Sequence, residues 1–423
     1  MPFEIHDTAL VAVLTVLSWG SGRRLKGVTA MSTQEVPAQS KAIVDAAGSG
    51  LEGVVVARTD LSDVDGLAGR LTIRGYDLED LAGNATFEEV VYLLWNGSLP
   101  TQSEHDALHE KLAGFRQLPE ETRVAVELAA RRMGPMDALR FAVASLTADD
   151  DDADDESREA NLERAAKLAA RVPVIVADYQ RLRTGQQSIP PRAELRTAAN
   201  FLWQLTGVEP PAPEVRGLDT YWTTVSDHGM NASTFTARVI ASTASDMVSA
   251  VTGAIGALKG SRHGGAPGPA LEMIRAIGTP ENAEPWMRAA VARGERLMGF
   301  GHRVYKVRDP RAEVLSQAAE ALADETGEQK ALALAREVER AGVKVLAEVK
   351  PGRHLNTNVE FYTALLLSEI GLPPDLFSPA FAIGRMAGWT AHILENQEAG
   401  RLIRPSSEYT GPRDQRYAAI SER

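Results

Sequence analysis

The sequence predicts a mainly α-helical protein that carries one small β-hairpin near its amino end. Helical periodicity with start and stop signals fills almost all of the chain after Asp77, whereas strand-like alternation is confined to residues 53–76. The composition of 44% hydrophobic and 24% charged residues is typical of a globular protein and excludes disorder as the main state. A length of 423 residues provides a sizeable core and, at roughly 100 to 200 residues per domain, indicates two or three domains.

The charge and cysteine counts exclude several classes of function. Lysine and arginine number 45 against 57 acidic residues, so the net charge of -12 lacks the basic surface that nucleic-acid binding requires. Zero cysteines exclude disulfides, thiolate zinc sites, iron–sulfur clusters and a cysteine nucleophile. No nucleic-acid partner is therefore expected.

Residues 1–30 contain the most apolar run of the chain, residues 9–19, which is far shorter than the roughly 20 residues that a transmembrane helix needs. The acidic residues Glu4 and Asp7 precede this run, where a signal peptide carries positive charge, and a basic cluster follows it. We therefore interpret residues 1–30 as a non-native or disordered extension ahead of Met31. A cytoplasmic protein without a membrane partner is expected.

The predicted elements begin with the β-hairpin between Gly53 and Tyr76. The apolar stretch GVVVART is followed by the turn-rich DLSDVDG and by the alternating GRLTIRGY, which indicates two strands around a turn. Further along, the acidic run from Asp149 to Glu156 is predicted to be a solvated loop between helices.

Short helices joined by tight turns are expected after the hairpin. Thr86 with Glu89 and Thr101 with Glu104 have the spacing of a capping box, and each pair predicts the start of a helix. Gly97 stands where the first of these helices is expected to end.

Polar, glycine-containing segments surround three of the eight histidines: His228 in SDHGMNAST, His263 in GSRHGGAPG and His302 in GFGHRVYKVRDPRA. Taken singly, each is equally well explained as a structural histidine. Glycine lets the backbone approach a ligand closely. Arginine can form bidentate hydrogen bonds with a carboxylate, and arginines follow at Arg311, Arg385 and Arg404. The set as a whole predicts an anion site with neutral acid–base groups.

A metal or dinucleotide site is not predicted. The chain has no HExxH motif, and the spacings of 35 and 39 residues between His228, His263 and His302 match no ligand pattern. GFGHRV lacks the third glycine of a dinucleotide fingerprint, and no strand is expected before it.

When its motifs are taken together, the chain resembles the citrate synthases, the family that condenses acetyl-CoA with oxaloacetate. DHGMNAST, HGGAP, GFGHRVYKVRDPRA and NVEFYTALLL occur in this order and are followed by GRMAGWTAHILE and RLIRP. The combination is specific although no single motif suffices, and it extends from about Leu51 to Pro412. The resemblance implies an acyltransferase that converts an acyl group to an alkyl group on transfer and makes citrate and CoA. Acetyl-CoA would then be a substrate, and no cofactor is expected.

The resemblance also implies an all-α fold in which a small domain is inserted into a large one and closes over the substrate. We place the large domain at residues 31–263 and 365–423 and the small domain at residues 264–364. Closure protects reactive intermediates from water. A homodimer is implied as the smallest unit, because the residue that matches Arg404 reaches into the neighbour's site.

Roles for individual residues follow from the same resemblance. His263 matches the histidine that hydrogen-bonds the thioester carbonyl, and His302 matches the one that polarises the oxaloacetate ketone. Preorganised donors of this kind are needed because the methyl proton is too weakly acidic for a lone carboxylate to remove. The residues matching the groups that hold the substrate carboxylates are His228, Arg311, Arg385 and Arg404.

The catalytic base is where the chain departs from the family pattern. The best-known members have an aspartate there, whereas this chain has Glu360, which is one methylene longer. Thr357 with Glu360 also has the spacing of a capping box, so Glu360 could instead close the start of a helix. With the surrounding motif included, we favour the base.

CoA contacts are expected from the backbone of residues 298–302, with Lys306 and Arg353 near the phosphates; two solvated cations are the alternative interpretation. Two other functions remain open. A 2-methylcitrate synthase would use propionyl-CoA, and a pocket separates substrates that differ by one methylene by only about 1–3 kcal/mol. A non-catalytic homologue would bind CoA or a dicarboxylate without turnover.

Overall fold

A computed structural model describes residues 50–51, 53–150, 155–264 and 267–423. The predicted extension at residues 1–30 lies outside these ranges. The chain divides into two compact units. The first comprises Met1–Val56 and Ser407–Arg423, and its described part contains the short 3-10 helix η4 (Ile420–Glu422). The second, Ala57–Ser406, holds every other element, and all further description concerns this unit.

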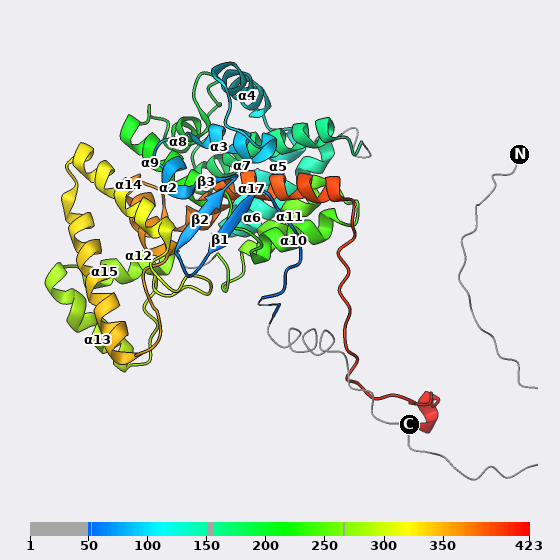
Figure 1. Ribbon diagram of the computed structural model, residues 1–423. Coiled ribbons are helices and arrows are strands. Elements are labelled where there is room, and N and C mark those ends of the chain that lie inside the picture. Colours follow the sequence, from blue (N-terminus) through cyan, green and yellow to red (C-terminus); the bar gives the residue numbers. More distant parts are fainter. Residues whose placement is uncertain (1–49, 52, 151–154, 265–266) are drawn as a thin grey trace, which may run out of the picture. The chain divides into compact units, whose positions relative to one another are not determined.

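Helices build almost all of the second unit, which confirms the predicted fold class (Figure 1). Up to residue 225 they are α2 (Leu78–Leu81), α3 (Phe87–Asn96), α4 (Gln102–Phe115), α5 (Glu120–Arg132), α6 (Pro135–Ser145), η1 (Leu146–Asp149), α7 (Arg158–Arg183), α8 (Thr197–Thr206) and α9 (Ala212–Val225). The remaining ones are α10 (Ala232–Ala241), α11 (Met247–Leu258), α12 (Pro267–Ile277), η2 (Pro280–Asn282), α13 (Ala283–Ala292), α14 (Pro310–Thr326), α15 (Gln329–Val349), α16 (Val359–Glu369), η3 (Pro374–Leu376) and α17 (Phe377–Ala399).

The small sheet is antiparallel and lies where a hairpin was predicted, but its first strand is displaced along the chain. Its strands are β1 (Ser62–Asp65), β2 (Arg70–Ile73) and β3 (Tyr76–Asp77), in that spatial order, and Ser62 pairs with Ile73. The prediction of a strand in GVVVART was wrong, because β1 lies in the stretch interpreted as the turn. The turn is made instead by Asp65, whose carboxylate accepts the N–H groups of Leu67 and Ala68.

The helix starts predicted in the first third of the chain are confirmed. Thr86 and Thr101 each accept the N–H of the glutamate three residues later, and each glutamate accepts the threonine's N–H in return. Gly97 ends α3 in a left-handed conformation, with φ of 88°, as glycine favours.

The acidic run differs from a simple solvated loop. Asp149 ends η1 and pairs with Arg171 of α7 at 2.6 Å, and Asp150 pairs with Arg164 of the same helix at 2.8 Å. Both arginines are buried, so these two carboxylates supply the charge that a buried guanidinium needs. Residues 151–154 lie outside the described ranges, and Glu156 is exposed.

Helix α17 forms the centre of the second unit. It packs against α3, α7, α9, α10 and α11 and is buried along most of its length (Figure 1). Small residues make this possible: a Cβ on Gly388 would lie 2.4 Å from the carbonyl oxygen of Ser226, so only glycine lets α17 pass so close to that backbone. No helix within the described ranges combines the length and apolarity that crossing a membrane requires.

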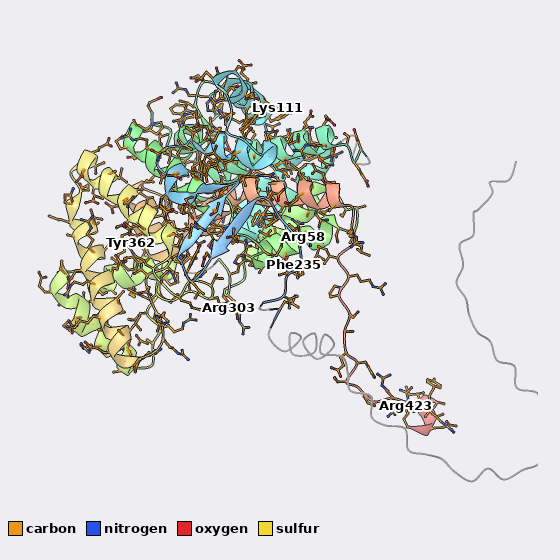
Figure 2. The ribbon with its side chains drawn as sticks, in the orientation of Figure 1. Arg58, Lys111, Phe235, Arg303, Tyr362 and Arg423 are labelled. Carbon is orange, nitrogen blue, oxygen red and sulfur yellow. The ribbon has the colours of Figure 1, made fainter. Side chains whose placement is uncertain are left out.

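Helices α12 to α15 and the first half of α16 lie in the stretch predicted as the inserted small domain, and the boundaries at residues 264 and 364 remain a prediction. Within this stretch α13 packs on α15, and α14 packs on α15 and α16. Tyr362 of α16 lies beside α15 and donates its hydroxyl to Glu339 of that helix at 2.6 Å (Figure 2). Helix α14 also packs on α9.

Candidate active site

The loop that carries His302 is joined to the start of α16 by a short antiparallel pairing. Phe300 pairs with Thr357, and the N–H of Asn358 donates to the carbonyl of Gly299 at 3.0 Å. Gly299 has φ of 81°, and a Cβ there would lie 2.8 Å from Phe361, so both its conformation and its packing require glycine. This pairing holds the loop that ends at His302 against the first turn of α16.

The backbone fixes the tautomer of His302. Its Nδ1 accepts the N–H groups of Val304 and Tyr305, each at 3.1 Å, so the ring hydrogen lies on Nε2. Burial, followed by the charge of Arg311, lowers the pKa of His302 to about 4, which keeps the ring neutral. His302 is therefore a neutral hydrogen-bond donor.

Arg311 is held in place by its own helix start. Asp309, the N-cap of α14, accepts from the backbone N–H of Arg311 and from its Nε and Nη2, at 2.8–3.0 Å. Asp309 Oδ2 also accepts the N–H of Val359 at 3.3 Å, which ties the starts of α14 and α16 together. Arg311 Nη2 lies 3.4 Å from His302 Nε2. The guanidinium of Arg311 and the ring of His302 therefore lie side by side, so one ligand oxygen can contact both groups.

His228 and Arg385 complete this group of donors. The rings of His228 and His302 lie 5.7 Å apart, and Tyr305 bonds to His228 Nε2 at 3.1 Å. Burial, then Arg311 and Arg385, lower the pKa of His228 well below its ordinary value. Arg385 is 1% exposed; its Nε donates to Val225, and its buried Nη1 has no partner among the described residues. A buried, unpaired guanidinium nitrogen is costly unless a ligand accepts from it.

Glu360 is the second residue of α16, where burial raises its pKa to about 7 although the charge of Arg311 opposes the change. The alternative role as a capping residue is wrong. The N-cap is Asn358, whose side chain accepts the N–H of Glu360 at 3.1 Å, and Thr357 Oγ1 has no partner among the described residues. Glu360 is thus a carboxyl group that can exchange its proton near neutral pH.

His263 is connected to α10 and α17 through one serine. Its Nε2 accepts the N–H of Ser233 at 3.3 Å and lies 2.8 Å from that residue's hydroxyl, which also accepts from Trp389 Nε1 at 3.1 Å. The hydrogen of the ring is therefore on Nδ1. Burial and the charge of Arg385 lower the pKa of His263 to about 4, so this ring is also neutral.

The other three predicted residues do not join this group. Lys306 is exposed and donates to the carbonyl of Arg303 at 3.0 Å; Arg303 is exposed on the same loop (Figure 2). Arg353 is exposed after α15, and Arg404 is exposed on the segment that follows α17. Their predicted roles in binding CoA and in a neighbouring subunit's site remain predictions.

Sequence reasoning missed four further residues that belong to the site. Asp309 and Tyr305 lie within the quoted GFGHRVYKVRDPRA segment, where their spacing from Arg311 and His302 was an available signal. Ser233 lies in DHGMNAST and could have been found in the same way. Tyr221 lies in the middle of α9 outside any quoted motif; its buried hydroxyl has no partner among the described residues, and burial raises its pKa well above the ordinary value.

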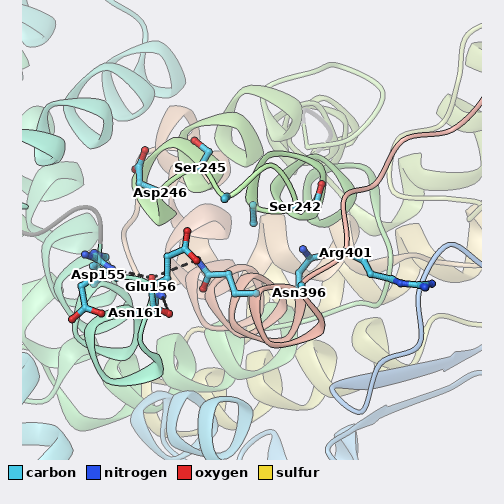
Figure 3. A pocket seen from close by; sticks show the side chains of 13 residues that line it. Asp155, Glu156, Asn161, Ser242, Ser245, Asp246, Asn396 and Arg401 are labelled. Atoms are coloured by element: carbon cyan, nitrogen blue, oxygen red, sulfur yellow. Dashed lines mark hydrogen bonds between the residues drawn. The ribbon is translucent and has the colours of Figure 1, made fainter. Parts of the chain in front are cut away.

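A polar pocket of about 290 Å³ at the carboxyl end of α17 is a different place in the molecule (Figure 3). Asn396, Arg401, Asp246 and Arg164 are among its lining residues. None of the nine predicted site residues lines it, so the candidate site is the half-buried group around His302 and Glu360.

The fold and the site together define an all-α protein with a buried anion site, in which neutral histidines and partly unpaired arginines surround one carboxyl group. The family described as "Citrate synthase, C-terminal domain" matches residues 50–406. The chain belongs to the citrate synthase family, which confirms the resemblance carried by the motifs.

Individual relatives cover nearly the whole chain. Citrate synthase from Haloferax volcanii is 45% identical over 379 residues, which are 88% of this chain and 98% of the relative. 2-Methylcitrate synthase from Mycobacterium tuberculosis is 38% identical over 386 residues, 91% of this chain and 94% of the relative.

Solved structures of the family have the same fold. Citrate synthase from Pyrobaculum aerophilum is 38% identical, with a TM-score of 0.81, over 88% of this chain and 94% of that one. The ternary complex of carboxymethyl coenzyme A and oxaloacetate with citrate synthase from Thermoplasma acidophilum is 32% identical, also with a TM-score of 0.81, over 89% and 99% of the two chains.

Proposed function

We propose that this protein condenses acetyl-CoA with oxaloacetate and water to give citrate and CoA, and so acts as an acyltransferase in which the acyl group becomes an alkyl group. The observation that carries the proposal is the neighbourhood of His302 and Arg311, whose Nε2 and Nη2 lie 3.4 Å apart, together with Glu360, whose pKa is about 7. A keto dicarboxylate offers oxygens that both groups can bind, and the glutamate supplies the base.

Oxaloacetate is proposed to bind among the buried donors. Arg385 Nη1 and the guanidinium of Arg311 would receive its carboxylates, as arginine does in bidentate pairs. The Nε2–H of His302 would donate to the ketone oxygen and make the ketone carbon more electrophilic. His228 lies at the edge of this group, 3.1 Å from the Tyr305 hydroxyl.

The acyl-CoA is proposed to be activated by Glu360 and His263. Ionised Glu360 would remove a proton from the methyl carbon, and the Nδ1–H of His263 would donate to the thioester oxygen, on which negative charge develops. The methyl carbon then bonds to the ketone carbon of oxaloacetate as the C=O π bond breaks. The former ketone oxygen takes the negative charge beside His302 and Arg311 and then a proton, which makes it the hydroxyl of the product. Water finally cleaves the thioester and releases CoA.

The contacts to CoA and the second subunit extend the proposal. Lys306 and Arg353 are exposed cations that would meet the CoA phosphates, and Arg404 would act in the partner's site of a homodimer. Exposure of Arg404 on a segment beyond α17 supports a role outside its own site. A cytoplasmic location belongs to the same proposal.

A 2-methylcitrate synthase that uses propionyl-CoA is the second candidate. The Mycobacterium tuberculosis relative of that name covers 91% of this chain, which favours it alongside the citrate synthases. The two reactions differ by one methylene in the acyl group, which one pocket separates by only about 1–3 kcal/mol.

Release of the free CoA thiol tests both candidates. Purified protein is mixed with oxaloacetate and either acetyl-CoA or propionyl-CoA, and the thiol is measured with a chromogenic disulfide. The chain has no cysteine, so the protein contributes no background. We expect release with acetyl-CoA that requires oxaloacetate. Faster release with propionyl-CoA would favour 2-methylcitrate synthesis, and binding of CoA without any release would show a non-catalytic homologue.

A further inference from the structure

One face of α17 holds the backbone that leads into His228. Gly388 and His392 follow Arg385 by three and by seven residues, so all three lie on the same side of the helix. They contact three consecutive residues: Arg385 Nε donates to the carbonyl of Val225 at 2.7 Å, the N–H of Gly388 donates to that of Ser226 at 3.1 Å, and His392 Nε2 lies 3.2 Å from Asp227 Oδ1. The next residue is His228.

His392 has a defined tautomer although it is fully buried. Arg238 of α10 donates from Nη1 to His392 Nδ1 at 3.0 Å, and arginine has no acceptor. His392 therefore carries its hydrogen on Nε2 and donates it to the carboxylate of Asp227. The charge of Arg238 is balanced by Glu395 at 2.5 Å. The hydrogen-bond network that starts at Asp227 and His392 therefore ends in the ion pair of Arg238 and Glu395.

Asp227 is held from a second side by the small sheet. Ser62 of β1 donates its hydroxyl to Asp227 Oδ2, and the same hydroxyl accepts the N–H of Gly229 at 3.0 Å. Both neighbours of His228 in the chain are thus fixed. Burial opposes ionisation of Asp227, but His392 and Arg385 outweigh this effect and lower its pKa, so the carboxylate stays ionised.

We propose that His392 is a positioning residue for the dicarboxylate site. It holds the Asp227 carboxylate, and through it the orientation of the adjacent His228, without touching the substrate. The inference rests on the proposed function, because it names oxaloacetate as the ligand. Leucine at position 392 would leave a buried carboxylate and a buried guanidinium nitrogen each without one partner, which is costly enough to move both groups. Glutamine supplies an N–H donor and an oxygen acceptor at similar reach and would replace both bonds.

Calorimetric titration with oxaloacetate alone tests the inference without any turnover. The proteins are wild type, His392→Leu, His392→Gln and the control Thr390→Val. Thr390 is a buried residue of α17 that accepts from Trp95 Nε1 of α3 at 2.8 Å, so its loss removes a comparable buried hydrogen bond on a different side of the helix. We expect His392→Leu to raise the Kd for oxaloacetate at least tenfold, and His392→Gln to stay within threefold of wild type. Thr390→Val is expected to lower the melting temperature and leave the Kd unchanged.

Several results would overturn the inference. They are an unchanged Kd in folded His392→Leu, an equal loss of affinity in Thr390→Val, and a failure of glutamine to restore affinity. Should His392→Leu not fold, His392→Asn replaces it, because the shorter amide reaches only one of the two partners. Its Kd is then expected to exceed that of His392→Gln, and equality would contradict the proposal. If wild type binds no oxaloacetate, the proposed function itself fails, which is a distinguishable outcome.

Discussion

Glu360 makes the sharpest prediction about the proposed reaction, because its pKa and its role are linked. Burial raises the pKa from 4.5 to about 7, so at about 1.4 kcal/mol per pKa unit the ionised form costs about 3 kcal/mol more than in water. The base must be ionised to accept a proton. At pH 6 about a tenth of the molecules carry the ionised form, and kcat/KM should fall about tenfold for each pH unit below 7.

The assay is the pH profile of kcat/KM for acetyl-CoA at saturating oxaloacetate, measured from pH 5.5 to 9. Bound oxaloacetate adds negative charge near Glu360, so the midpoint of the acid limb should lie at or above 7. His263 and His302 titrate near pH 4 and do not contribute in this window. Glu360→Gln should lower kcat by about 10² or more, because the amide keeps the size of the side chain but cannot accept the proton.

Glu360→Asp is the matched control, since it keeps a carboxylate at the same backbone position. It should retain the acid limb and lose less activity than the glutamine variant. A limb with its midpoint near 4.5, the ordinary value of a glutamate, would refute the assignment. Near-normal turnover in Glu360→Gln, with only a lower melting temperature, would refute it independently.

Three further predictions follow from the same site and chain. The lowered pKa of His302 means that its protonation favours the unfolded state, so its stabilising contribution is complete above pH 6.5 and is lost as the pH falls toward 4. The free energy of unfolding of wild type relative to His302→Gln should therefore drop by up to about 3 kcal/mol between pH 7 and pH 4 in urea titrations; a constant difference would contradict this. Mixing inactive His302→Ala with inactive Arg404→Ala should restore activity if Arg404 serves the partner's site, and confirmed subunit exchange without recovery would place Arg404 in its own site. A chain that starts at Met31 should turn over as fast as the full chain, and lost solubility or activity would show that residues 1–30 are required.

The sequence predicted those parts of the site that lie within continuous motifs. His228, His263, His302, Arg311 and Arg385 are all identifiable beside glycine or in short polar segments, and the family resemblance attached roles to them. A capping box is equally local, which is why the helix starts at Thr86 and Thr101 were predicted correctly.

The parts that were missed depend on packing between distant segments. Nothing in the sequence around Tyr221 indicates that its hydroxyl is buried within reach of the charges of Glu360 and Arg385, and the bond between Trp389 and Ser233 joins residues 156 positions apart. The first strand was misplaced for a related reason. GVVVART alternates well enough for a strand, but the sheet forms where Leu71 and Ile73 are buried, and Val55 stays 85% exposed.

Carboxylates near Arg311 and Arg385 bear on how an acidic protein would bind the proposed dianion. Asp309 pairs directly with Arg311 at 2.8 Å, whereas burial lowers the pKa of Arg385 to about 10 although the charge of Asp227 opposes this change. The charge of Arg311 is thus largely balanced by Asp309, which reduces the cost of burying it, whereas Arg385 keeps a buried Nη1 without a partner among the described residues. Affinity for oxaloacetate then depends on the orientation of donors more than on excess positive charge. The pKa of Glu360 is high for a related reason: burial raises it, the charges of Arg311 and Arg385 oppose this effect, and the carboxylate of Asp309 cancels part of that opposition.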